Sequence, residues 1–404
     1  MSRNSLRNEY RTVIVMALCF GLVGIDRFVI NPLFPTIAND LALDYRDMGV
    51  ISGSLAAAWG AAAIIMGRVA DKIGIKVVLV LSTILFSALF GAGGMASSLV
   101  SLLWLRVLIG LAEGAFVPAC FVATSHASHP SRVGLNIGIL HLAFTFCGFG
   151  LAPLLATQLL KILPSWRWVF GLIAVPGFIL AYCIQRFLQP DRQRREGEAG
   201  LSLPFWTILT QRRIMVNAVV MVCRLSSVST LGVFLPSYLI KYHGLGMSEM
   251  GVVLSSMGIG SVLGMVVLPS LGDRVGYWRI AVAGAGLSLS SLGFFCLASS
   301  GAKYLFVPLF LMGLTGGGVT AIVVGPLTNG AVPPRLAATA TGIIVGLGEF
   351  FGGALAPVLA GFLANRYGIE VVPNLAFIAG TLGFLTLLLG GHHTKDQTNA
   401  KDSY

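Results

Sequence analysis

The chain has 404 residues, of which 56% are hydrophobic and only 11% charged, and its mean hydropathy is +0.85. Because a soluble globular protein carries about 25% charged residues, this composition excludes a cytosolic enzyme, a disulfide-stapled secreted domain and a disordered chain. We expect an all-α integral membrane protein whose formal charge of +11 lies mostly at the lipid headgroups.

Twelve apolar stretches follow one another along the chain, each long enough to cross about 30 Å of hydrocarbon. They cover 12–37, 46–70, 77–97, 99–124, 132–161, 165–188, 211–240, 247–271, 278–299, 302–326, 335–364 and 370–391. One long polar connection divides them six and six. The sequence therefore predicts an N-terminal six-helix bundle at 1–188, a cytoplasmic linker at 189–210, and a C-terminal six-helix bundle with a short cytoplasmic tail at 211–404.

The basic residues predict the orientation of these spans. If both termini are cytoplasmic, eighteen of the 27 Lys and Arg residues lie inside, six lie outside and three lie within spans. This asymmetry follows the positive-inside rule. It also explains the net charge without a nucleic-acid partner, since no basic cluster interleaved with aromatic residues is present.

Two motifs recur at about half the chain length. Gly67-Arg-Val-Ala-Asp71-Lys72-Ile-Gly74-Ile-Lys follows the second span, and Asp273-Arg274-Val-Gly follows the eighth, with the aspartates 202 positions apart. Leu-Ala-Pro at 151–153 returns 204 positions later at 355–357. Such repeats indicate a duplicated transporter whose site lies between the halves near the midplane.

Charged side chains inside the spans are the candidate functional residues, because one charge at the centre of a membrane helix costs at least about 2.5–3.5 kcal/mol. In chain order they are Asp26, Arg27, Arg106, Glu113, Arg224 and Glu349. Arg27 shares a helix face with Asn31, which predicts a polar stripe towards a cavity. Gly110 and Gly114 lie on the side of Arg106 and Glu113 and leave room for a ligand or another helix. Arg224 is one turn from the position that repeats Arg27, so both arginines are expected to face one central cavity.

The Gly67-to-Lys76 motif resembles the signature loop of the major facilitator superfamily, with Val77 replacing its last basic residue. The resemblance implies two pseudo-symmetric bundles of six helices and a conformational gate at Gly67, Asp71, Lys72, Gly74, Asp273 and Arg274. In the second copy Pro269 stands where the first glycine is expected.

Within that superfamily the chain resembles the anion:cation symporters. Three segments carry the likeness: Gly-Ile-Asp-Arg at 24–27, Arg106 and Glu113 with Gly-Ala-Phe-Val-Pro after them, and Ser-Trp-Arg-Trp-Val-Phe at 165–170. The resemblance implies that Arg27 binds a substrate carboxylate and that Asp26 and Glu113 serve proton coupling. Cys223-Arg224, with Pro-Ser-Tyr at 236–238, resembles the seventh helix of the vesicular glutamate branch, which implies that Arg224 is linked to substrate. Ser52 stands where the vesicular glutamate branch has a histidine, which argues against that activity.

Structural roles compete with these functional ones. Asp26 or Glu113 could be a permanent structural partner of an arginine. The alternative for Arg224 is an internal salt bridge, and for Arg106 a gate or an ion pair. Glu349 has no motif match and suits packing, gating or a second proton site. His141 suits either a cavity lining that contacts substrate or a hydrogen-bonded core position.

We therefore expect a monomeric, proton-coupled symporter of a small organic anion in the cell (inner or plasma) membrane. Its substrate would be a carboxylate such as a sugar acid, a dicarboxylate or an aromatic acid. An exporter of the same fold and a non-transporting membrane sensor are the alternatives. No enzyme motif, metal site or organic cofactor is expected, because the six cysteines are scattered singly and lack metal-ligand partners.

Overall fold

A computed structural model describes residues 3–188, 210–297, 302–333 and 336–391 of the chain. Side chains are described within these ranges except at 3–5, 64–72, 302–303, 338 and 391. The described part is helical throughout, as the sequence predicts. The predicted linker at 189–210 falls outside the described residues except for Thr210, and so does the tail after Gly391.

The helices of the first half correspond to the first six predicted spans, and three of these spans are composite. They are α1 (Arg3–Phe28) with α2 (Ile30–Leu41), α3 (Tyr45–Ile73), α4 (Ile75–Ala92) with η1 (Gly93–Met95), α5 (Leu99–Ala127), then η2 (Pro130–Arg132), α6 (Val133–Thr145), η3 (Phe146–Leu151) and α7 (Ala152–Ile162) in the fifth span, and α8 (Trp166–Phe187).

The second half repeats this plan, with helices at the other six predicted spans. They are α10 (Arg212–Lys241), α11 (Met247–Val275), α12 (Tyr277–Leu297), α13 (Ala302–Ile322) with η4 (Val323–Leu327), then α14 (Ala337–Leu347), η6 (Gly348–Leu355) and α15 (Ala356–Tyr367) in the eleventh span, and α16 (Val371–Gly391). Eleven of the helical spans in the described residues are long and apolar enough to cross a membrane, and α3 lies at the remaining predicted position.

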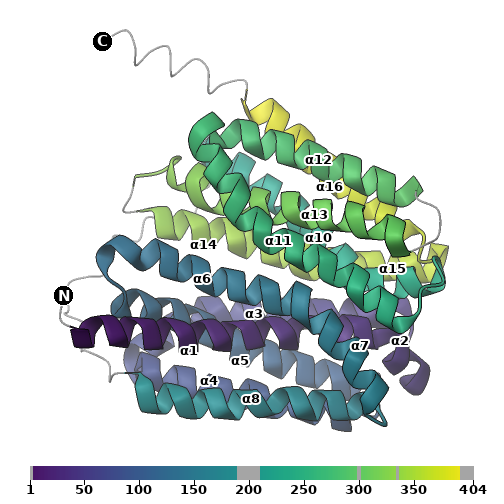
Figure 1. Ribbon diagram of the computed structural model, residues 1–404, viewed down its shortest axis with the longest axis horizontal. Coiled ribbons are helices and arrows are strands. Elements are labelled where there is room, and N and C mark those ends of the chain that lie inside the picture. Colours follow the sequence, from purple (N-terminus) through teal and green to yellow (C-terminus); the bar gives the residue numbers. More distant parts are fainter. Residues whose placement is uncertain (1–2, 189–209, 298–301, 334–335, 392–404) are drawn as a thin grey trace.

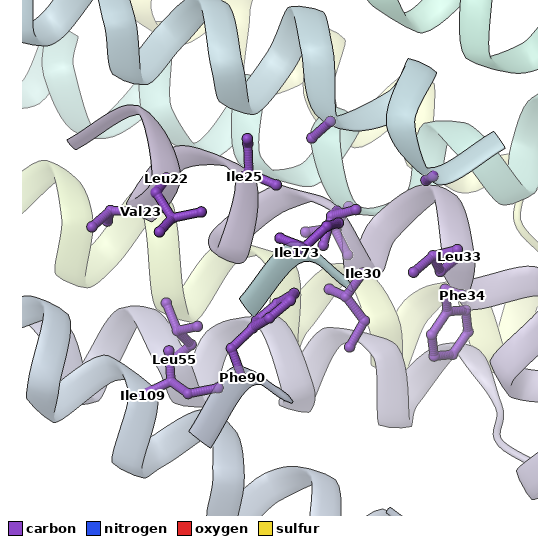
Figure 2. Packing of buried hydrophobic residues seen from close by; sticks show 14 of the residues in the cluster. Leu22, Val23, Ile25, Ile30, Leu33, Phe34, Leu55, Phe90, Ile109 and Ile173 are labelled. Atoms are coloured by element: carbon purple, nitrogen blue, oxygen red, sulfur yellow. The ribbon is translucent and has the colours of Figure 1, made fainter. Parts of the chain in front are cut away.

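The two halves lie side by side with their helices roughly parallel to one long direction (Figure 1). The first-half helices α1, α3, α4, α5 and α8 occupy the lower part of that view, and the second-half helices α10 to α16 occupy the upper part. Buried apolar side chains of the first span form the centre of the first-half core. Figure 2 shows Ile25, Ile30 and Leu33 of that span near Phe90 of α4 and Ile173 of α8.

Pairs of glycines allow the closest helix contacts within each half. Gly110 and Gly114 of α5 lie against the backbone of α3, where a Cβ on Gly110 would lie 2.5 Å from the Leu55 carbonyl oxygen. Gly313 and Gly317, 203 positions later, lie against the backbone of α11 in the same way. The room beside Arg106 and Glu113 is therefore filled by another helix, which is the small-residue packing that membrane helices favour.

Proline interrupts the helices at the level of the charged residues. The first span breaks at Val29, four residues after Ile25 and shortly before Pro32, whose ring excludes the regular bond to the carbonyl of residue 28. In η3 and η6 the backbone winds as a π-helix, and each is followed by Ala-Pro. The Leu-Ala-Pro repeat of the sequence thus marks the ends of two matching π segments.

The contacts between the halves are concentrated far from the beginning of α1. In the described residues, the hydrogen bonds and cation–π contacts that join the halves lie at the middle of the helices or at the end where α2 meets α3. At that end Asn365 donates to Asp44 at 3.1 Å, and the Arg46 guanidinium lies 4.8 Å from the Phe362 ring centre. A Cβ on Gly49 would lie 2.5 Å from the Pro357 carbonyl oxygen. This end of the molecule is closed by direct helix contact.

Candidate functional site

Arg27 forms an ion pair with Glu349 across the two halves. Its Nη2 lies 2.5 Å from the Glu349 Oε2, and the side chains of the two residues are only 12% and 15% exposed. Arg27 is in the last turn of α1, where a cation is favoured by the helix dipole, and Glu349 is the second residue of η6. The structure thus joins two predicted site residues that are 322 positions apart.

The guanidinium of Arg27 is also held between two aromatic rings. Its carbon lies 5.6 Å from the Trp59 ring centre and 5.7 Å from the Phe28 ring centre, within the range of cation–π attraction. Gly353 borders the pair, because a Cβ there would lie 2.7 Å from the Glu349 Oε2 and 3.5 Å from Nη2 of Arg27. These neighbours fix the guanidinium at the seam between the halves.

Asn31 lies one turn beyond Arg27 and also reaches the second half. Its amide nitrogen donates to the Gly232 carbonyl oxygen of α10 at 3.0 Å, while its own oxygen has no hydrogen-bond partner among the described residues. The predicted polar stripe of the first span therefore faces α10 and η6 at the seam, and it leaves one buried acceptor available.

Asp26, Arg106 and Glu113 are buried inside the first half instead. Arg106 donates from Nη1 to the Asp26 carbonyl oxygen at 3.1 Å, so its contact is with the backbone of α1. Both carboxylate oxygens of Asp26 and of Glu113 lack a hydrogen-bond partner among the described residues. Two buried carboxyl groups thus lie inside the first half without a hydrogen-bond partner among the described residues.

Arg224 is directed into the second half. Its Nε donates to the Gly316 carbonyl oxygen at 3.3 Å, and its side chain lines a cavity of about 40 Å³ between α10, α12, α13 and α16. The expectation that Arg224 faces the same cavity as Arg27 is not met in this state. The physical reason is that Arg224 lies one turn from Ser227, which repeats Asp26 at an offset of 201 and likewise faces the interior of its bundle.

His141 packs among aromatic rings of the first half. Its ring centre lies 5.2 Å from that of Phe121 and 5.8 Å from that of Phe20. These contacts fit the core alternative for His141, and no described contact brings it to Arg27.

The predicted gate motifs have matching backbones at the two repeats. Gly74 and Gly276, 202 positions apart, both adopt positive φ values of 96° and 103° between consecutive helices. Only glycine takes this conformation without strain, so the repeat has a conformational reason. Asp273 accepts a hydrogen bond from the Tyr277 hydroxyl, and Arg274 is exposed. The side chains of Asp71 and Lys72, and the surroundings of Gly67, lie outside the described part.

An ion pair of the buried Glu9, near the start of α1, is absent from the sequence-based predictions. Glu9 binds Arg132 with an oxygen–nitrogen distance of 2.6 Å and accepts hydrogen bonds from the Asn136 amide at 2.9 Å and the His129 backbone at 3.3 Å. Glu9 precedes the predicted first span, so its burial has no signal in the hydropathy pattern. The network ties α1 to the connection between α5 and α6.

The motif Ser-Trp-Arg at 165–167 has a structural explanation. Ser165 caps α8, while the Trp166 indole and the Arg167 guanidinium donate to the same Asp40 oxygen at 3.0 and 2.8 Å. These bonds join the end of α2 to the start of α8. In the described residues no group of three or more His, Cys, Asp or Glu side chains is placed to hold a metal ion.

Comparisons with known proteins agree with this architecture. The model of the Major Facilitator Superfamily matches residues 16–357. The chain is 24% identical to a hexuronate transporter of Bacillus subtilis (strain 168), over 88% of each chain, and 26% identical to a 3-(3-hydroxy-phenyl)propionate transporter of Escherichia coli (strain K12), over 89% of each. An inward-facing, unoccupied bacterial homologue of the human lysosomal transporter Spinster superposes with a TM-score of 0.77 at 16% identity, over 96% of both chains. The chain is a multi-pass membrane protein that belongs to the Major Facilitator Superfamily.

Proposed function

We propose that this protein carries a small organic anion across the cell (inner or plasma) membrane by proton-coupled symport. The observation that carries the proposal is the Arg27 guanidinium at the seam, which already holds a carboxylate from the opposite half at 2.5 Å. The names of the two relatives, a hexuronate transporter and a 3-(3-hydroxy-phenyl)propionate transporter, support a carboxylate substrate. The resemblance to the anion:cation symporters involves the same residues.

Arg27 is the primary contact for the substrate carboxylate in this proposal. A guanidinium presents parallel N–H groups that match the two oxygens of a carboxylate, and its attraction is strong where water is excluded. We assign the Asn31 side-chain oxygen, which has no hydrogen-bond partner among the described residues, the role of accepting from a substrate hydroxyl. We assign Arg224 a supporting part, since in this state it is bound to Gly316.

Asp26 and Glu113 are the proposed proton acceptors. A buried carboxyl group without a hydrogen-bond partner costs less as the neutral acid than as the anion. Proton entry therefore lowers the cost of closing the loaded site, and an anion that arrives with a proton adds less net charge to the membrane interior. This is the physical basis of symport in the proposal.

The two bundles at 1–188 and 211–404 are the proposed moving units, in a protein that acts as a monomer with both termini in the cytoplasm. In that orientation the end closed by Asp44, Arg46 and Gly49 faces outwards. The linker and the repeated loops with Gly74 and Gly276 would then lie on the cytoplasmic side, where rocking opens and closes the seam.

Binding of matched acid and neutral ligands tests the proposed substrate class. Purified full-length protein is titrated calorimetrically with D-glucuronate and D-glucose, and with 3-(3-hydroxyphenyl)propionate and its amide. We expect heat of binding from at least one acid and none from its neutral counterpart, because only the acid pairs with Arg27. Equal binding of an acid and its neutral counterpart would rule out a carboxylate-specific site.

A further inference from the structure

We propose that Glu349 is a built-in competitor of the substrate at Arg27, and that proton uptake by Glu349 frees Arg27 for the substrate carboxylate. The inference rests on the proposed function, because it assumes an organic anion at Arg27. It adds a third proton-linked carboxyl group, on the opposite bundle from Asp26 and Glu113. The role of this third group is to control binding.

The geometry makes the two occupants of Arg27 mutually exclusive. Glu349 holds Nη2 from the side of η6, while Trp59 and Phe28 lie within cation–π distance of the guanidinium. A substrate carboxylate that takes two parallel N–H groups needs the edge that Glu349 now touches. Glu349 therefore has to leave before a bidentate contact can form.

Charge leads to the same conclusion. An Arg27–Glu349 pair is neutral overall and attracts an anion weakly, whereas Arg27 beside a protonated Glu349 is a net positive site. Binding of one anion is then linked to uptake of one proton by Glu349, and each ligand strengthens the binding of the other by the same factor.

The described charged groups around Glu349 support this pairing. Arg27 of α1 contacts Glu349 directly. Arg224 of α10 is directed to Gly316 instead. The charged side chains described for α3 and α15 lie at the closed end of these helices. The sequence of α14 has no ionisable side chain. Among the described residues, Arg27 is the one charged side chain that pairs with Glu349.

The backbone around Glu349 departs from a regular α-helix. Glu349 lies in a π-helical segment, where the hydrogen-bond pattern departs from the regular α-helix, and such segments occur often at functional sites. Gly348, Gly352 and Gly353 surround it in sequence, and Gly353 leaves the space that the carboxylate occupies. A side chain at 353 would push the carboxylate away from Arg27.

Calorimetric titration of three proteins tests the proposal: the wild type, Glu349→Gln and Gly353→Ala. Each full-length protein is titrated with D-glucuronate and with 3-(3-hydroxyphenyl)propionate at about pH 6 and about pH 8. The wild type is expected to bind less tightly at the higher pH, by up to about tenfold per pH unit for each linked proton. Asp26 and Glu113 are unchanged in all three proteins, so a difference in slope isolates Glu349.

Glu349→Gln is expected to bind at least about tenfold more tightly at the higher pH, since close charge pairs have coupling energies of this size or larger. Its pH dependence should be smaller than that of the wild type by one proton per anion. Gly353→Ala should shift binding in the same direction by a smaller factor, and it supplies the test if Glu349→Gln does not fold. Glu370→Gln, which alters an exposed glutamate of the same half, is the matched control and should behave as the wild type.

Two results would overturn the inference, and they differ in what they say of the proposed function. If the wild type binds an acid and Glu349→Gln binds it equally or less tightly with an unchanged pH slope, Glu349 is not a competitor and the proposed function stands. If neither protein binds an acid at either pH, the anion site itself is absent and both proposals fall.

Discussion

The interiors of the two bundles have the same helix framework and different ionisable groups. In the first half, Asp26 and Glu113 contribute two buried carboxyl groups beside Arg106. At the repeated positions of the second half stand Ser227, at an offset of 201, and Gly316, at the offset of 203 that relates the paired glycines of α5 and α13. Arg224 fills the space beside Gly316, where any Cβ would overlap its guanidinium.

The duplication preserves the features that position helices and changes the ionisable groups. The glycine contacts, the positive-φ loop glycines and the π segments recur, because they position helices. The ionisable groups do not recur: among the described residues, the interior of the first bundle holds two carboxyl groups and Arg106, and that of the second holds Arg224. The two proposed proton acceptors inside a bundle, Asp26 and Glu113, thus both belong to the first half, while Arg27 and Glu349 pair at the seam between the halves.

The largest expected effect distinguishes the two arginines. Arg27→Gln should weaken binding of the best-bound acid about 100-fold, because it removes the cation that contacts the carboxylate. Arg224→Gln should change it by less than about threefold, since its contact is with Gly316 inside the other bundle. Calorimetry on both variants measures the ratio. An equal or larger loss for Arg224→Gln would mean that the cavity of the second half is the substrate site.

The next effect separates proton coupling from binding. Asp26→Asn and Glu113→Gln should each reduce accumulation of the acid under an imposed proton gradient about tenfold or more, because the proton site is lost. Exchange of labelled for unlabelled acid, which needs no net proton movement, should stay within about twofold. Both are measured in proteoliposomes beside Glu370→Gln as the control. Full accumulation by both variants would remove these two residues from the coupling step.

A smaller effect concerns the stability of the first half. Glu9→Gln should lower the melting temperature of the purified protein by a few degrees, because it breaks the ion pair with Arg132 while the amide still fills the space. Binding of the acid should be unchanged. Differential scanning calorimetry checks the shift, and an unaltered melting temperature would show that the network adds nothing to the stability of this bundle.

Much of the fold is predictable from the sequence because each span is a local pattern. Apolar length identifies the helices, and the offsets of 202 and 204 identify the duplication. The break at Val29 and the π segments are less evident, since proline predicts a disturbance and not its form. Helix ends also differ: α1 begins at Arg3, nine residues before the predicted span, because a helix continues beyond the hydrocarbon.

The site is predictable only in its components. The free-energy cost of a charge inside a membrane helix identifies Arg27, Glu113 and Glu349 as candidate functional residues. Which of them pair depends on the packing of helices that are 322 positions apart, and no spacing rule contains that information. The direction of Arg224 differs from expectation for a related reason. Arg224 is one helix turn from both position 227, which repeats Asp26, and position 228, which repeats Arg27, so the alignment alone does not select the face. Glu9 lies outside the predicted spans and has no local signal.

Gradient-driven uptake into proteoliposomes tests whether this protein carries an organic acid together with a proton. The wild-type protein is given the acid that it binds best, with the external solution more acidic than the lumen, and with equal pH on both sides as the reference. We expect the acid to accumulate above its external concentration only when the proton gradient is present, and we expect no accumulation of its neutral counterpart. Accumulation that is the same with and without the gradient, or no transport of any acid that the protein binds, would contradict it.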